Sequence, residues 1–333
     1  TGKNGATHDI DGKDQNILIV GNDDRTNMTN AEVHTLKVGR DGGSMATDTM
    51  MIVHVPADGK KATLISLPRD SYVAIPGYGK DKLNAAYIDG YDHASGTPDQ
   101  KRAAGADLLI KTVQNLTGLT INHYVQVSLM GFYDISNAIG GVPINLCHAV
   151  NDPAENGHGS GFVMSAGKHV IQGVQALEFV RQRYNFPNGL GDLDRVKRQQ
   201  YFLAAAFRKV ASVGILFKLQ SLGDAVKRNL YMDQNLDLLS LAQQMENLSA
   251  NNIVGVTIPT EFGTSPDGQS ILVVSPAKVQ AFIDKLINPP APATPAARPT
   301  TTPSTHSTSA GTPATKPATS SSGPAPIDSK CIN

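Results

Sequence analysis

The sequence predicts an α/β protein, a three-layer α-β-α sandwich whose central mixed sheet is covered by helices on both faces. Short apolar runs typical of buried strands alternate along the chain with longer segments whose apolar residues recur at helical spacing. An Asp-Gly turn between two of the runs predicts a hairpin, which brings antiparallel pairing into the sheet. With 333 residues, the chain is long enough to bury a substantial core.

The first three strands are expected near the N-terminus. Residues 16–21 read as a buried strand, the polar and Gly-rich segment 22–47 as a connection, and 49–55 as the second strand. The turn at Pro56-Ala-Asp-Gly leads into a third strand at 63–67. In this hairpin, the end of the third strand lies beside the start of the second.

The remaining elements follow from periodicity and from Gly stop signals. We expect a helix at about 99–116 before Gly118, a strand at 123–129, a helix at 132–139 closed by Gly140-Gly141, and a strand at 142–146. An amphipathic stretch at 168–177 and a helix from 195 to about 210 follow. Residues 213–287 contain at least two more helices and a strand near 253–258.

Composition divides the chain into three parts. Residues 1–14 are polar and predict a flexible lead-in, and residues 15–287 form the folded domain. Residues 288–333 are mostly Pro, Ala, Thr and Ser, which predicts a disordered linker toward a further, missing C-terminal domain. The chain starts with Thr and has no apolar run long enough for a membrane helix, so we interpret it as the excised soluble portion of a larger protein.

Charge and cysteine content exclude several classes of function. The 29 basic residues balance the 29 acidic ones, and no nucleic-acid-binding motif is found, so nucleic acid is not an expected partner. Cys147 and Cys331 are far apart, and we expect no bond between them. No zinc, dinucleotide or Walker motif occurs.

Positive charge is concentrated between Glu178 and Gln200. Arg181 and Arg183 share one face if their segment is extended, and a helix capped by Asp192 or Asp194 places two more arginines and a glutamine on one side. These further residues are Arg195, Arg198 and Gln199, with Lys197 beside them. Because guanidinium groups bind phosphate oxygens bidentately, the cluster predicts a pocket for a phosphorylated ligand, the alternative being a solvated face with surface ion pairs.

Acidic residues at the strand ends predict a second feature of the same site. If segment 22–47 returns antiparallel, Asp23, Asp48, Arg69 and Asp70 gather at one edge of the sheet. Such a group suits a divalent cation and phosphate, although Asp23 and Asp48 could equally be turn acceptors. For Asp70 we favour a structural role as the partner of Arg69.

These residues fall into a series of motifs that resembles the LytR-CpsA-Psr family over about residues 15–210. The segments that carry the resemblance are, in order, 18–25, 47–51, 66–70, 82–87, 123–127, 139–142 and 179–200. The resemblance implies a phosphotransferase that is anchored in the cell membrane by one N-terminal segment, with this domain on the extracytoplasmic side. It implies transfer of a glycopolymer, arabinogalactan in mycolate-bearing actinobacteria, from a polyprenyl (decaprenyl) pyrophosphate carrier onto peptidoglycan.

The resemblance also implies roles for particular residues. Asp23 and Asp48 would bind Mg²⁺, or Mn²⁺ in its place. The transfer chemistry also requires a general base, for which Asp48 and Asp23 are both candidates. The other implied catalytic residues are Arg69, Arg181 and Arg183, and the implied substrate-binding residues are Arg25, Lys82, Asp192, Arg195 and Gln199. The family commonly has an arginine where this chain has Ala46, so one phosphate contact is missing unless Arg25 or Arg40 replaces it.

A polyprenyl tail also requires an apolar tunnel. Its candidate linings are Val125, Val127, Leu129, Phe132, Ile135, Ile139, Tyr201, Phe202, Ala204, Ala205 and Phe207, although residues at such spacing usually form ordinary core. Two other functions remain open. One is a pyrophosphatase of polyprenyl pyrophosphates, and the other is a non-catalytic envelope scaffold or regulator that binds lipid phosphate.

Overall fold

The structure is a computed structural model that describes most of residues 13–288 together with Cys331 and Ile332. The described residues are 13–25, 28–36, 38, 43–154, 159–182, 192–212, 230–233, 235–236, 240–241, 244, 248, 252–288 and 331–332. Residues 1–12 of the predicted lead-in and nearly all of the predicted linker therefore lie outside the described residues.

A six-stranded mixed sheet forms the middle layer. Its order is β11 (Leu230–Met232), β6 (His123–Val127), β1 (Gln15–Asp24), β2 (Gly43–Val55), β3 (Ala62–Ser66) and β12 (Ile253–Thr257). β1 and β3 run antiparallel to β2, whereas β6 and β12 run parallel to β1 and β3, respectively. The predicted hairpin is confirmed, since Met51 lies opposite Ser66.

The turn between β2 and β3 requires its glycine. Gly59 has φ 60°, and its N–H donates to the Pro56 carbonyl at 2.9 Å. A Cβ at this position would lie 1.7 Å from the Gln244 carbonyl oxygen, so no other residue fits without a shift of the backbone.

Alternate residues of the sheet face two separate cores, as the period of a strand requires. Leu18, Ile52 and Ile65 point toward one layer of helices. Ile17, Val53 and Leu64 point to the other side, where they pack with Ala204. The central strands are thus buried on both faces.

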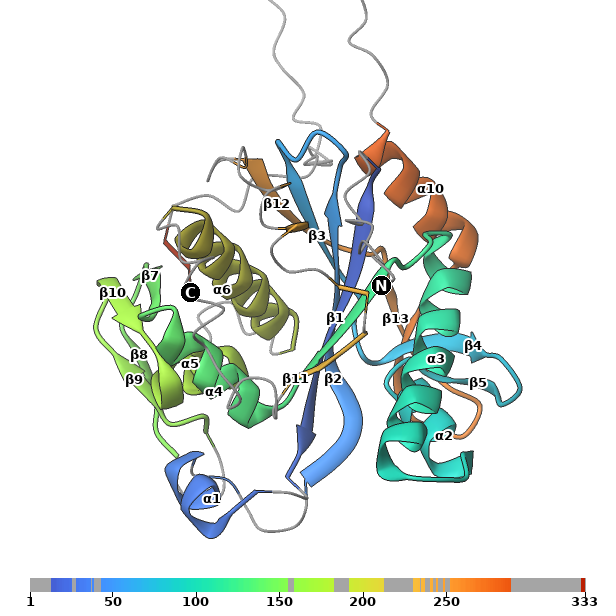
Figure 1. Ribbon diagram of the computed structural model, residues 1–333, viewed down its shortest axis with the longest axis horizontal. Coiled ribbons are helices and arrows are strands. Elements are labelled where there is room, and N and C mark those ends of the chain that lie inside the picture. Colours follow the sequence, from blue (N-terminus) through green and yellow to red (C-terminus); the bar gives the residue numbers. More distant parts are fainter. Residues whose placement is uncertain are drawn as a thin grey trace, which may run out of the picture.

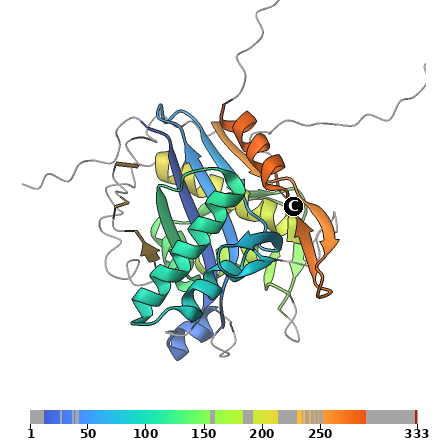
Figure 2. The ribbon, with the colours of Figure 1, turned by 90° about the vertical axis from the view of Figure 1, so that its right-hand side faces the viewer.

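Helices cover both faces of the sheet (Figure 1). On one side lie α2 (Ala85–His93), α3 (Pro98–Thr117) and α10 (Pro276–Ile287), which stand in front of the sheet in Figure 2. On the other side lie α4 (Leu129–Ala138), α5 (Gly173–Arg181) and α6 (Asp192–Ser212). The predicted three-layer sandwich is therefore confirmed.

The helix predicted before Gly118 has the capping residues that made its two ends predictable from the sequence. Thr97 accepts from the Gln100 N–H, the Gln100 side chain accepts from the Thr97 N–H, and Pro98 occupies the first turn. Gly118 closes the helix in the left-handed conformation with φ 74°. These capping residues lie within a few positions of the helix ends, so the sequence alone is enough to recognise them.

Smaller elements complete the fold. They are α1 (Asn30–Leu36), a four-stranded sheet in the order β13 (Glu261–Thr264), β14 (Ser270–Val273), β4 (Ser71–Ile75) and β5 (Gly79–Lys82), and the pairs β7 (Val142–Leu146) with β10 (Gly167–Ile171) and β8 (Val150–Asp152) with β9 (Phe162–Met164). None of the described helices has the length and apolarity needed to cross a bilayer.

The structure corrects the expectation for the two cysteines. Cys147, just after β7, forms a disulfide with Cys331, so the end of the chain returns to the folded domain. Sequence separation, here 184 positions, says little about distance in a folded chain.

The candidate active site

A row of alternating charges is centred on Arg69 and Asp70 in the connection from β3 to β4, and it includes Asp48 of β2 and Lys82 of β5. Arg69 donates through Nη1 to Asp48 Oδ1 at 2.7 Å, and its Nε lies 3.4 Å from Asp70 Oδ2. Lys82 Nζ lies 3.2 Å from the other oxygen of Asp70. The expected meeting of Asp48, Arg69 and Asp70 is therefore confirmed, and Asp70 holds Arg69 as expected. We call these four residues the strand-end ion chain.

A β-bulge directs Asp48 toward this chain. Gly21 lies opposite Thr49 but Asn22 lies opposite Thr47, so Asp48 is the extra residue on β2. A second irregularity follows, because Asp23 lies opposite Ser44 and leaves Met45 and Ala46 unmatched. Bulges change the direction of side chains at sheet edges, which here turns Asp48 out of the regular alternation.

Asp23, the other predicted metal ligand, is the last but one residue of β1 and is held by Arg25. The Arg25 guanidinium binds the Asp23 carboxylate through two nitrogens, Nε at 2.7 Å and Nη2. Arg25 was one of two possible substitutes for the arginine absent at Ala46, and its observed partner is the Asp23 carboxylate. Arg40, the other, lies outside the described residues.

The donor set at this edge suits Mg²⁺ in kind. Mg²⁺ is commonly held by one or two carboxylates, with phosphate oxygens and water completing its octahedron. Asp23 supplies one carboxylate near the end of β1, and Asp48 supplies another at the bulge within β2, beside Gly21 and Asn22 of β1. In the described part of the chain no three His, Cys, Asp or Glu residues gather as a metal site, so most ligands would come from substrate and water.

The predicted extended segment at Arg181 is wrong. Arg181 is the last residue of α5, and the buried Gln182 caps that helix. The pattern of 168–177 combines β10 and the start of α5, which concealed the helix boundary. Arg183 lies outside the described residues, so the predicted pair is not placed.

Helix α6 joins the two halves of the predicted site. Gln199 Nε2 lies 3.4 Å from the Val180 carbonyl oxygen at the end of α5. The next residue, Gln200, donates from Nε2 to Ser66 Oγ at 2.8 Å and to the Val256 carbonyl at 2.7 Å. Since Ser66 ends β3, α6 brings the end of α5 and the connection that carries Arg69 onto one stretch of helix.

The remaining cations of α6 differ in environment. Arg195 is buried, whereas Lys197 is exposed and lies 3.2 Å from Asp194. Asp192 is the first residue of the helix, and its side chain is outside the described part.

Arg198 is a core residue rather than a member of a ligand-facing cluster. It is fully buried, and its guanidinium carbon lies 4.7 Å and 5.7 Å from the ring centres of Phe179 and Phe162. Burial lowers the pKa of Arg198 to about 10, and the carboxylates of Asp152 and Asp194 oppose that shift. Sequence spacing on the helix could not reveal this role, because the aromatic partners come from β9 and α5.

Several proposed tunnel linings pack against each other. Phe132 and Phe202 have ring centres 5.0 Å apart, in a core that includes Ile139, Tyr201 and Ala205. The tunnel itself stays a prediction.

The sequence is similar to that of a known protein family and of several cell-wall proteins. The model of the LytR_cpsA_psr family matches residues 3–288. The cell wall biosynthesis protein LcpA of Corynebacterium glutamicum is 36% identical over 299 residues, covering 83% of this chain and 56% of LcpA. The chain spans about half the length of its C. glutamicum relatives, since only 43% of LcpB is covered. The polyisoprenyl-teichoic acid–peptidoglycan teichoic acid transferase TagU of Oceanobacillus iheyensis is 31% identical over 243 residues, covering 73% of this chain and 66% of TagU.

Solved structures agree on the fold. Bacillus subtilis TagV has a TM-score of 0.62 at 21% identity, with 82% of this chain and 97% of TagV covered. TagT bound to LI-WTA has a TM-score of 0.60 at 24% identity, with 84% of this chain and 92% of TagT covered.

Proposed function

Because the chain belongs to the LytR_cpsA_psr family, we propose that it transfers a cell-wall glycopolymer from a polyprenyl pyrophosphate carrier onto peptidoglycan. The names of LcpA and TagU, a cell wall biosynthesis protein and a teichoic acid transferase, support this class of reaction. We further propose arabinogalactan as the polymer and decaprenyl as the lipid, which the family resemblance implies for actinobacteria with a mycolate-bearing envelope.

The observation that carries the proposal is the strand-end ion chain. Its cations are only partly buried, with 23% of the Arg69 side chain exposed, so phosphate oxygens can reach them. Each cation rests on a carboxylate, which holds it in place before substrate arrives. Such fixed charge stabilises the negative charge that develops during transfer more than mobile charge in water does.

Arg69 and Lys82 would bind the oxygens of the pyrophosphate, with Arg181, Arg183, Arg195 and Gln199 contributing from α5, α6 and the segment between them. Bound Mg²⁺, held by Asp23 and Asp48, would neutralise phosphate charge. Asp48 would take the proton from the attacking sugar hydroxyl through its second carboxylate oxygen, while Oδ1 keeps Arg69 in place. The hydroxyl oxygen would form a new bond to the phosphorus that carries the glycan, while the bond from that phosphorus to the bridging oxygen breaks and polyprenyl phosphate leaves with the electron pair.

The Cys147–Cys331 disulfide supports the proposed location outside the cytoplasm. Disulfides persist in oxidising compartments and are rare where thiols are kept reduced. We place the domain on the outer face of the cell membrane, held by an N-terminal anchor.

The test is an assay with radiolabelled lipid-linked glycan as donor, with and without peptidoglycan fragments. Transfer of label to peptidoglycan, abolished in Arg69→Ala and retained in the exposed Lys278→Ala, is the expected result. Free glycan phosphate formed equally without acceptor would instead indicate a pyrophosphatase. Donor binding without any turnover would indicate a scaffold.

A further inference from the structure

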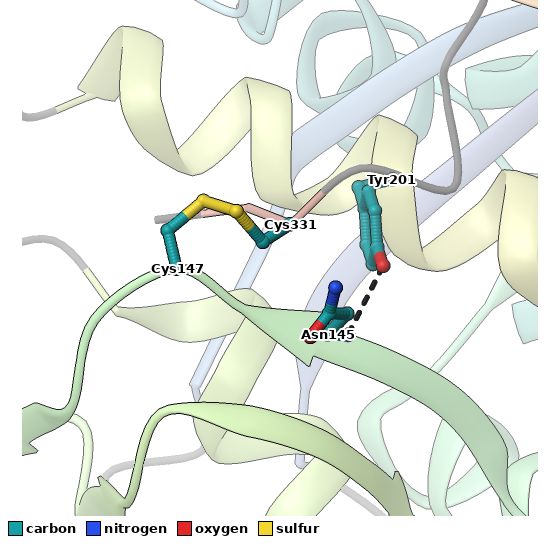
Figure 3. The surroundings of a disulfide bond; sticks show 4 residues. All are labelled: Asn145, Cys147, Tyr201 and Cys331. Carbon is teal, nitrogen blue, oxygen red and sulfur yellow. Dashed lines mark hydrogen bonds between the residues drawn. A yellow bond between two sulfur atoms is a disulfide. The ribbon is translucent and has the colours of Figure 1, made fainter.

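The C-terminal residues Cys331 and Ile332 extend the small β10–β7 sheet. Ile332 N–H donates to the Asn145 carbonyl at 2.8 Å, and Cys147 N–H donates to the Ile332 carbonyl at 3.0 Å. Ile332 is bridged in parallel to Leu146 and packs against the core formed by β7, α5 and α6. The disulfide makes this attachment covalent (Figure 3).

The same residue of β7 holds helix α6. Asn145 N–H donates to the Tyr201 hydroxyl oxygen at 3.1 Å, so one peptide position contacts the chain end through its carbonyl and α6 through its N–H. Figure 3 shows Tyr201 pointing at Asn145 beside the disulfide. The Tyr201 ring is buried among aromatic and aliphatic side chains, so its hydroxyl is held against one residue of β7, Asn145.

Tyr201 directly follows the two residues that assemble the candidate site. Gln199 contacts the end of α5 and Gln200 contacts the end of β3. A small movement of α6 along its axis at Tyr201 would therefore displace Gln199 and Arg195 relative to Arg69. Substrate-binding geometry is sensitive to displacements of this kind.

We propose that Tyr201 is a positioning residue and that the Cys147–Cys331 clamp acts through it. The clamp fixes β7, and the hydrogen bond between Asn145 and Tyr201 holds α6 at a defined position relative to β7. The position of α6 in turn sets the distance between its substrate-binding groups and the strand-end ion chain. The inference rests on the proposed function, because its kinetic consequence is defined for the transfer reaction.

The experiment is a double-mutant cycle in the full chain, with Tyr201→Phe, the pair Cys147→Ser and Cys331→Ser, and all three substitutions together. Phe keeps the packing and removes the hydroxyl. We expect Tyr201→Phe to raise the KM for labelled lipid-linked donor about fivefold, the worth of one hydrogen bond. The serine pair should raise KM by at least as much, and the triple variant should add little to the pair, since both changes interrupt one path.

Val150→Ala is the matched control. Val150 belongs to the same core, so its truncation lowers stability without touching the path. Its KM should equal that of the unchanged protein at temperatures where both are folded. A KM that rises equally in Val150→Ala, or effects of Tyr201→Phe and the serine pair that simply add, would overturn the proposal.

A second measurement separates this inference from the proposed function. Amide hydrogen exchange in residues 195–205 should quicken in Tyr201→Phe and in the serine pair by more than their loss of global stability explains, whereas in Val150→Ala any change should match its loss of global stability. If the unchanged protein shows no transfer, the proposed function fails, and exchange alone decides the clamp. Unaltered exchange in both variants would overturn the clamp whatever the activity.

Discussion

Arg69 and Arg198 show how the same type of side chain serves different purposes in two regions of the molecule. Arg69 lies just after β3, is partly open to solvent, and forms ion pairs with Asp48 and Asp70. Arg198 lies one layer away, fully buried between Phe162 and Phe179. A substrate can exchange for the partners of the first but cannot reach the second. Burial, rather than residue type, therefore separates the proposed role of Arg69 from the structural role of Arg198.

The largest expected effect comes from the buried region. Arg198→Ala removes the positive charge near the buried Asp152 and Asp194 and leaves a cavity beside two rings. We expect the free energy of unfolding, measured with urea, to fall by about 3–5 kcal/mol. Arg198→Met, which fills most of the space, should lose less. Normal stability combined with lost donor binding would place Arg198 in the ligand site and break the contrast.

The next effect concerns the residue that joins the two regions. Gln200→Ala leaves the buried Ser66 hydroxyl and the Val256 carbonyl without its amide, so unfolding free energy should fall by about 2 kcal/mol. Gln280→Ala, which loses an exposed bond to the Asn115 carbonyl, is the matched control and should change little. Equal losses in the two variants would show that α6 is not held at the end of β3.

A smaller effect is expected in the strand-end ion chain. Asp70→Asn removes the charge that orients Arg69 and Lys82 while keeping the shape of the side chain. We expect kcat/KM for donor to fall about tenfold, which corresponds to roughly 1.4 kcal/mol, with stability nearly unchanged because exposed ion pairs stabilise little. The exposed Asp99→Asn should leave both quantities as they are. A large loss of stability in Asp70→Asn would make this region structural as well.

The smallest effect is a pH dependence of stability. Burial lowers the pKa of His54 from its ordinary value of 6.5, although the carboxylate of Asp14 opposes the shift, and its Nδ1 lies 2.8 Å from Asn16 Oδ1. Since the unfolded chain binds the proton more readily, this contribution to stability is complete above pH 6.5 and is lost as pH falls toward the lowered value. His54→Gln should flatten the decline in urea titrations between pH 7 and about pH 5. An unchanged slope would mean that other groups cause it.

The sequence predicted what local signals specify. The hairpin at Gly59, the helix closed by Gly118 and the meeting of Asp48 with Arg69 all depend on short-range turn chemistry or strand register. The disulfide and the burial of Arg198 depend on partners that are distant in the chain, so no spacing revealed them. Arg181 was placed on an extended segment because β10 and α5 adjoin without a recognisable break.

Binding of a short-chain polyprenyl pyrophosphate with Mg²⁺ tests the central claim most directly. Titration calorimetry would compare the unchanged protein with Arg69→Ala and with Arg198→Met at a temperature where all are folded. We predict that Arg69→Ala weakens binding at least tenfold, about 1.4 kcal/mol, and that Arg198→Met binds as the unchanged protein does. Undiminished binding by Arg69→Ala would contradict a diphosphate site at the end of β3.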